Sequence, residues 1–285
     1  MTISSQTEGV VQLWRGTVPD MTSENGAQFD GVRVELTDDH VGTVLFSRPP
    51  NNFFDVELVT EVADAFERLA NDITCRVIVL RSAGQHFCAG AQLHGDSEDV
   101  ITMAPPDENP LYAQALRLVG CAVPTIAVVQ GAAIGGGLGV ALAADFRIAS
   151  RKARFAANFA KLGMHQGFGI TLTLPAVVGQ QRALELLYTG RRVTGDEAFQ
   201  IGLVDQLVAP DELPTATDNL AQQIAASAPL AVRSIRQTMR AELLQRMVAV
   251  THREHAAQRG LRRTVDFKEG VEAYASRRPA KFVGR

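Results

Sequence analysis

Two segments rich in small residues could stabilise negative charge on a bound ligand. They are SAGQHFCAGAQL at 82–93 and QGAAIGGGLG at 130–139, and each directly follows a short apolar run. Glycines at a turn that opens a helix leave backbone N–H groups bare, with the positive end of the helix dipole behind them. An oxyanion hole needs donors that converge from two directions. Two such turns after neighbouring strands therefore favour an oxyanion hole.

Other roles for the second segment stay open. A dinucleotide-binding fold carries Gly-x-Gly-x-x-Gly in its first strand–helix unit, whereas this glycine cluster lies in mid-chain. A phosphate loop requires Gly-Lys-Ser/Thr, and Leu138 and Gly139 stand in those places. Close packing of a helix on a sheet would also use glycines. The pattern disfavours a nucleotide site and leaves oxyanion stabilisation and close packing.

The elements that position these segments alternate between strand and helix. Apolar runs predict strands at 32–36, 41–46, 77–80, 125–129, 146–149 and 203–208, the first two as a hairpin. Helical periodicity marks 55–71, 111–119, 138–144, 182–188 and most of 217–275. Alternation of this kind predicts an α/β architecture with crossover connections.

Composition excludes several classes of protein. The 285 residues are 46% hydrophobic and 21% charged with a net charge of −3, which disfavours disorder and a nucleic-acid footprint. Three widely spaced cysteines predict reduced thiols in a cytoplasm, with no metal site. The longest uncharged stretch, 118–144, is interrupted by Pro124 and glycines, so no membrane span is expected. A small-molecule enzyme fits these figures.

Nine motifs, in order along the chain from about residue 30, resemble the enoyl-CoA hydratase/isomerase (crotonase) superfamily. They are FCAGAQL at 87–93, VPTIA at 123–127, GGG at 135–137, ADFRIA at 144–149, VG at 178–179, ELLYTG at 185–190, AFQIGLV at 198–204, FKEG at 267–270 and RRP at 277–279. The resemblance implies a spiral of ββα units at 29–210, after a flexible arm at 1–28. A C-terminal helical region at 211–285 would mediate trimers or dimers of trimers.

The resemblance also implies the chemistry. Two backbone N–H groups would stabilise a thioester enolate, and position by position they fall on Ala91 and Gly136. Substrate-binding positions carried over in the same way are Ala89, Gln92, Leu93, Ile134, Gly135, Phe159, Tyr274 and Arg277. Tyr274 and Arg277 would reach coenzyme A (CoA) from an adjacent subunit. No cofactor is expected beyond the CoA of the substrate.

The chain departs from the family pattern at the catalytic carboxylates. Gly139 and Phe159 stand where hydratases carry two glutamates, and the loop MHQGFG at 164–169 lacks the aspartate of dienoyl isomerases and aryl-CoA dehalogenases. Neither residue can transfer a proton, which puts ordinary hydration in doubt. His165 is the first candidate for an acid or base, since imidazole titrates near neutral pH. It could instead only hydrogen-bond the loop backbone.

The resemblance, together with the missing carboxylates, implies an acyl-CoA-processing enzyme that performs isomerisation, decarboxylation or hydrolysis. A catalytically silent acyl-CoA binder would use the same donors and is the alternative. Phe53, Phe54, Phe159 and Phe168 suggest an apolar acyl site, although core packing explains phenylalanines equally well. Cys88 is expected to pack rather than to react, and Asp145 to cap or turn the chain.

Overall fold

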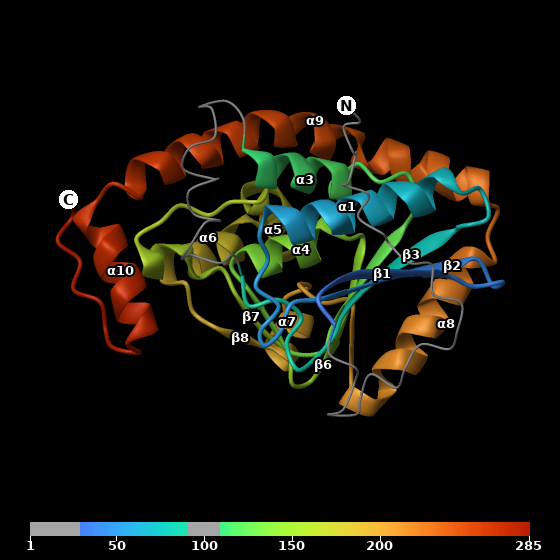
Figure 1. Cartoon of the computed structure of the whole chain (residues 1–285), viewed down its shortest axis with the longest axis horizontal. Helices are drawn as coiled ribbons and strands as arrows, with labels where there is room; N and C mark the ends of the chain where they lie inside the picture. The colour runs from blue at the N-terminus through green and yellow to red at the C-terminus, as the bar shows by residue number, and fades with distance from the viewer. Residues whose placement is uncertain (1–28, 91–108) are drawn as a thin grey trace, which may run out of the picture.

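The computed structural model describes residues 29–90 and 109–285 and contains two β-sheets with helices on both faces of the larger one (Figure 1). The six-stranded sheet has the order β1-β2-β3-β4-β6-β9, and only the β1–β2 hairpin is antiparallel. Its strands are β1 (Gly31–Leu36), β2 (Val41–Ser47), β3 (Val77–Ser82), β4 (Thr125–Val129), β6 (Phe146–Ser150) and β9 (Gln206–Val208). The predicted α/β class is confirmed.

A second sheet makes the path a spiral. It contains β5 (Ala132–Ile134), β7 (Arg154–Ala156) and β8 (Val193–Thr194), in the order β5-β7-β8. The chain passes from β4 into β5 and then α4 (Gly136–Ala143), and from β6 into β7 and then the 3₁₀ helix η1 (Asn158–Leu162). After β3, Cys88 pairs with Ala133 of β5 in the same way. This repeated β–β–helix path is the spiral that the resemblance implied.

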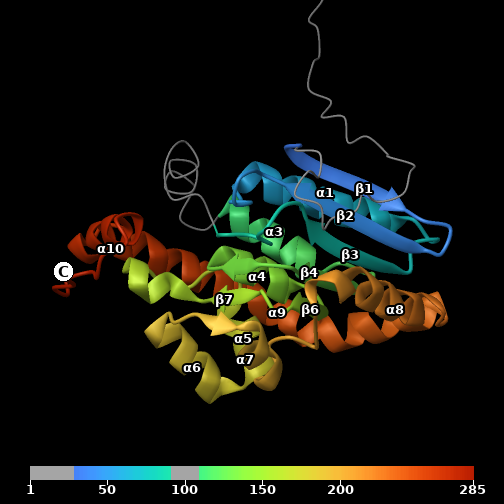
Figure 2. The same cartoon turned by 90° about the horizontal axis from the view of Figure 1, so that it is seen from below.

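Helices cover both faces of the larger sheet because its central strands are apolar on both sides. Ile78 and Leu80 face the main core under α1 (Val56–Asn71) and α3 (Pro110–Val119). Val77 and Val79 face the opposite side, where α8 (Leu213–Ala225) packs. Figure 2 shows α8 on the side of the sheet away from α1 and α3. The alternation of side chains along a strand explains why one apolar run serves two cores.

The C-terminal helices run along the core and then return to it. After α8, α9 (Pro229–Leu261) extends beside α3, and α10 (Val265–Ala275) packs against η1 (Figure 1). A Cβ on Gly270 of α10 would lie 2.6 Å from the Leu162 carbonyl carbon, so the two backbones touch. None of the helices in the described ranges is long and apolar enough to cross a membrane.

Some predicted boundaries are wrong. The strand expected at 203–208 is only β9, because the N–H groups of Leu203 and Val204 donate to the Ala198 carbonyl and not to a neighbouring strand. The segment 130–139 is not all loop, since β5 forms within it. The helix 55–71 is confirmed, and the Asp55 side chain caps it by accepting from the Leu58 N–H at 2.9 Å. The sequence did not indicate α5 (Ile170–Val178) or α7 (Gly195–Gln200); α6 spans Gln180–Thr189.

Asp145 fastens α9 to the sheet, which is more than the capping role expected of it. Its carboxylate accepts the Thr125 N–H at 2.8 Å, at the start of β4. It also forms ion pairs with Arg236 at 2.7 Å and Arg240 at 2.6 Å, both from α9. Burial by itself raises the pKa of Asp145, but the two guanidinium groups hold that pKa below its ordinary value.

Replacing this carboxylate should destabilise the fold. We expect Asp145→Asn to lower the free energy of unfolding at pH 7 by roughly 3 kcal/mol, because the buried Arg236 and the half-buried Arg240 lose their ion-pair partner. A folded-state pKa below the unfolded value stabilises the protein above about pH 4 and ceases to do so as the pH falls through the folded-state pKa. The variant should therefore lose less stability than the parent between pH 5 and pH 3. Urea unfolding of both proteins across that pH range tests this prediction. An equal loss of unfolding free energy in the two proteins between pH 5 and pH 3 would contradict it.

Candidate functional site

The two glycine-rich segments lie side by side, as their positions after neighbouring strands predicted. The Cys88 N–H donates to the Ala132 carbonyl at 2.9 Å, and the Ile134 N–H donates to the Cys88 carbonyl at 3.0 Å. At Gly90 a Cβ would lie 3.0 Å from the Ile134 carbonyl oxygen. Of the predicted first-segment residues, Ala91, Gln92 and Leu93 lie outside the described ranges. Gly90, the last described residue of the first segment, thus lies against Ile134, two residues before the start of α4.

Glycine is favoured at positions 135, 136 and 137 for different physical reasons. Gly135 has a φ of +56°, which favours glycine at the turn into α4. A Cβ on Gly137 would lie 2.8 Å from the Cys88 Cβ, and one on Gly136 would lie 2.7 Å from Cε1 of Phe54. Close packing, the alternative interpretation, therefore explains Gly136 and Gly137 on steric grounds alone.

Gly136 also keeps a free donor by its place in the helix. It is the first residue of α4, and the first four N–H groups of a helix have no intrahelical acceptor. Every residue of α4 is buried. The positive end of the helix dipole at this terminus is consequently shielded from water, where its interaction with a negative charge is stronger than in solvent. This arrangement suits an anion that develops during a reaction.

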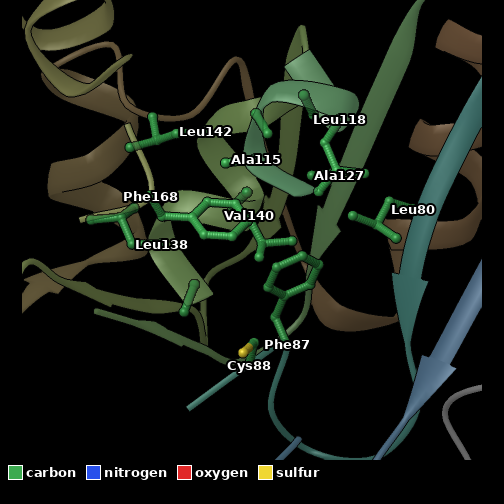
Figure 3. Close-up of a cluster of buried hydrophobic side chains, with 14 of the residues drawn as sticks. Leu80, Phe87, Cys88, Ala115, Leu118, Ala127, Leu138, Val140, Leu142 and Phe168 are labelled. Atoms are coloured by element: carbon green, nitrogen blue, oxygen red, sulfur yellow. The ribbon is translucent and has the colours of Figure 1, made fainter. Parts of the chain in front are cut away.

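An aromatic side chain occupies the space above Gly139. A Cβ on Gly139 would lie 2.9 Å from the Phe168 Cβ. The Phe168 ring lies 5.7 Å from the Phe54 ring, centre to centre. Figure 3 shows Phe168 together with Leu138 and Val140 among the buried side chains. Phe159 is also buried, so apolar groups stand where the family's hydratases carry carboxylates.

His165 is half-buried at the start of the loop that carries Phe168. Its Nδ1 lies 2.7 Å from the Gln166 carbonyl oxygen. A carbonyl only accepts, so Nδ1 carries the proton in this contact and Nε2 is left as the basic nitrogen. The backbone contact was the alternative role for His165, and it is compatible with a base at Nε2. Gln258 of α9 donates to the His165 carbonyl at 2.8 Å and fixes the residue's backbone.

The other predicted positions are spread over the fold. Ala89 is half-buried and its N–H donates to the Asn51 carbonyl at 3.1 Å. Ile134 is a residue of β5, not of a loop. Tyr274 and Arg277 are exposed at the end of α10, whose packing partner η1 contains Phe159 of the same chain. Their contact with CoA in an adjacent subunit stays a prediction.

The sequence pattern does not indicate the buried acid Glu254. Glu254 of α9 is fully buried and accepts the Gly169 N–H at 2.9 Å, the Thr171 N–H at 3.1 Å and the Thr171 hydroxyl at 2.6 Å. Burial raises the pKa of Glu254 above its ordinary value, against the effect of these hydrogen bonds. Nothing in the helical pattern of 217–275 distinguishes Glu254 from the exposed charges of α9.

Cys88 packs, as predicted. Its side chain is buried, and burial raises the pKa of the thiol to about 12, so it is not a nucleophile at neutral pH. All three cysteines are free. Within the described ranges no group of three His, Cys, Asp or Glu side chains could hold a metal ion.

Comparisons with known proteins give the chain a family. The enoyl-CoA hydratase/isomerase family model matches residues 37–285. The chain is 31% identical over 253 residues to 1,2-epoxyphenylacetyl-CoA isomerase of Escherichia coli (strain K12), covering 86% of this chain and 95% of the relative. It is 34% identical over 253 residues to (E)-benzylidenesuccinyl-CoA hydratase of Thauera aromatica, covering 86% and 96%.

A solved structure agrees with these relatives. The crystal structure of an enoyl-CoA hydratase/isomerase from Pseudoalteromonas atlantica T6c superposes with a TM-score of 0.80 at 29% identity, covering 89% of this chain and 100% of that one. The spiral of strands, the glycine segments and the matches over nearly the whole chain lead to one conclusion. The chain belongs to the enoyl-CoA hydratase/isomerase family.

Proposed function

We propose that this protein polarises the carbonyl of an acyl-CoA thioester with the N–H groups of Gly136 and Ala91 and stabilises the enolate that follows. The observation that carries the proposal is the shielded start of α4, where Gly136 offers its N–H beside the paired segment that leads to Ala91. Backbone donors need no reorganisation as charge grows on the thioester oxygen, so they lower the barrier rather than only the binding constant.

The reactions we favour are isomerisation and decarboxylation, which need no activated water, and hydrolysis with His165 as the group that activates the water, rather than hydration by the usual pair of carboxylates. Addition of water in the usual way needs carboxylates to position and activate it. Gly139 and Phe159 supply none, and Phe168 fills the space above Gly139. The relatives include an isomerase and a hydratase at similar identity, so their names leave the reaction of this chain open. The apolar surroundings of Phe54 and Phe168 favour an apolar acyl group.

His165 is our candidate for proton transfer. Its Nδ1–H is held by the Gln166 carbonyl, which leaves Nε2 free of this contact and able to accept a proton from the substrate. CoA enters as part of the substrate, with no further cofactor. The alternative is a silent binder that uses the same donors for recognition only, and the absence of carboxylates at Gly139 and Phe159 is the observation that favours it.

We also propose that the chain associates with copies of itself. Ile235 and Met239 of α9 are four residues apart, so they share one face of the helix, and both are more than 60% exposed, as apolar side chains of an association surface are. A closed homotrimer or a dimer of trimers would cover them.

The free buried thiols agree with a reducing compartment such as the cytoplasm.

The oxyanion assignment is tested by two substitutions at one position. Gly136→Ala and Gly136→Pro both add a Cβ beside Phe54, but only proline removes the N–H, and its φ suits the first turn of a helix. We expect turnover of an acyl-CoA substrate by the proline variant to fall at least ~100-fold below that of the alanine variant. Both are also made with Phe54→Leu to relieve the contact. Equal turnover in two folded variants would exclude Gly136 as a donor.

His165→Gln tests the proposed base. Glutamine keeps a polar side chain but does not titrate, so proton exchange at the substrate α-carbon should fall by ~100-fold or more. His252→Gln, an exposed position on α9, is the matched control. An exchange rate unchanged by His165→Gln would return the residue to a purely structural role.

Charge on α9 should weaken the assembly. We expect Ile235→Glu with Met239→Glu to lower the mass of the protein in solution, because the carboxylates would have to be desolvated in an interface. Light scattering after size-exclusion chromatography measures the mass. Phe199→Glu, at an exposed position on α7, should leave the mass unchanged. A monomeric parent protein, or a double variant with the mass of the parent, contradicts the proposal.

A further inference from the structure

The segment from Gly167 to Gly169 presents a single side chain to the core. Phe168 stands between two glycines and is only 2% exposed. A Cβ on Gly167 would lie 2.8 Å from Nε2 of Gln258 and 2.9 Å from Cζ of Tyr112. Gly169 packs equally closely against Met247. The backbone is thus enclosed by α3 and α9, and the Phe168 ring points to the opposite side, towards Phe54 and Gly139.

Phe168 holds an unfavourable backbone conformation. Its φ is +60°, in the left-handed region that bulky residues rarely adopt. Such a conformation persists only where the surrounding structure compensates for its cost, and it gathers at functional sites. The ring is therefore kept beside Gly139 against the local preference of the backbone.

Glu254 holds the backbone that directly follows Phe168. The carboxylate reaches from α9 to the residue directly after Phe168, where it accepts the Gly169 N–H, and to Thr171, where it accepts both N–H and hydroxyl. All three partners are donors, and they use both carboxylate oxygens, Oε2 for Gly169 and Oε1 for Thr171. Burying a carboxylate costs free energy unless its oxygens are hydrogen-bonded, and Glu254 is fully buried with its hydrogen bonds directed to one loop. These bonds fix that loop relative to α9.

We propose that Phe168 limits the size of the acyl group that the site accepts, and that Glu254 is the positioning residue that holds Phe168 in place. This inference rests on the proposed acyl-CoA function. The Phe168 ring fills the space above Gly139 and contacts the same Phe54 that packs on Gly136, the proposed oxyanion donor. An acyl group bound at Gly136 meets this aromatic wall, and one that extends towards Gly139 is excluded by it.

The test compares affinities for thioesters of graded size. The dissociation constants of butyryl-CoA, phenylacetyl-CoA and decanoyl-CoA are measured by calorimetry for the parent and for Phe168→Gly. Glycine favours the same φ and removes the ring. We therefore expect the ratio of the dissociation constant of butyryl-CoA to that of decanoyl-CoA to be about tenfold higher for Phe168→Gly than for the parent. Phe168→Leu should move the ratio less in the same direction, and it replaces Phe168→Gly if that variant does not fold.

Glu254→Gln tests the positioning role with little change of volume. Its amide NH₂ would face N–H donors, so the loop should loosen and the same ratio should move in the same direction as for Phe168→Gly. Thr251→Val is the matched control, because Thr251 is buried on α9 one turn away and bonds only carbonyls of its own helix. A merely structural loss of stability would weaken all three thioesters alike and would not change the ratio.

The outcomes are separable. A butyryl-to-decanoyl ratio for Phe168→Gly and Phe168→Leu within twofold of the parent overturns the role of Phe168. A Glu254→Gln ratio equal to that of Thr251→Val overturns the role of Glu254. A parent that binds none of the three thioesters overturns the proposed function, and the inference falls with it.

Discussion

The site depends on one backbone pairing between segments far apart in the chain. Cys88 exchanges hydrogen bonds with both ends of β5, which brings the turn after β3 against the turn that opens α4. The pairing needs residues without side chains, because a Cβ on Gly137 would collide with Cys88. The glycines that permit this close packing therefore also leave backbone N–H donors without a covering side chain at the start of α4. The steric and the chemical explanations of the glycines describe one arrangement.

Two acids connect this arrangement to the C-terminal helix. Asp145 ties α9 to the beginning of β4 through Arg236 and Arg240, and Glu254, farther along the same helix, holds the loop after η1. The Glu254 carboxylate is fully buried and the Asp145 carboxylate is half-buried, and both have most of their acceptor capacity used, which makes their removal costly and their geometry well defined. The long helix consequently serves as a rigid support for the start of β4 and for the loop that carries Phe168.

The sequence predicts whatever depends on local pattern. Continuous apolar runs identify the central strands, and the motifs identify the family and the position of Gly136. The ion pairs of Asp145 could not be predicted, because its partners lie 91 and 95 residues away and look like ordinary charges on a long helix. The positive φ of Phe168 is equally hidden, since it results from the packing of Gly167 and Gly169 against other elements. Long-range contacts, rather than composition, complete the site.

The measurement that tests the central claim most directly is mass spectrometry of acyl-CoA thioesters after incubation with the protein in deuterated water. The panel covers saturated, enoyl, β-keto and malonyl-type acyl groups. An enzyme that stabilises a thioester enolate at Gly136 must exchange the α-proton of at least one member or convert it to a product of different mass or structure. We predict deuterium at the α-carbon with the parent protein and none with Gly136→Pro. Tight binding of the thioesters without exchange or product would contradict the account and identify a silent acyl-CoA binder.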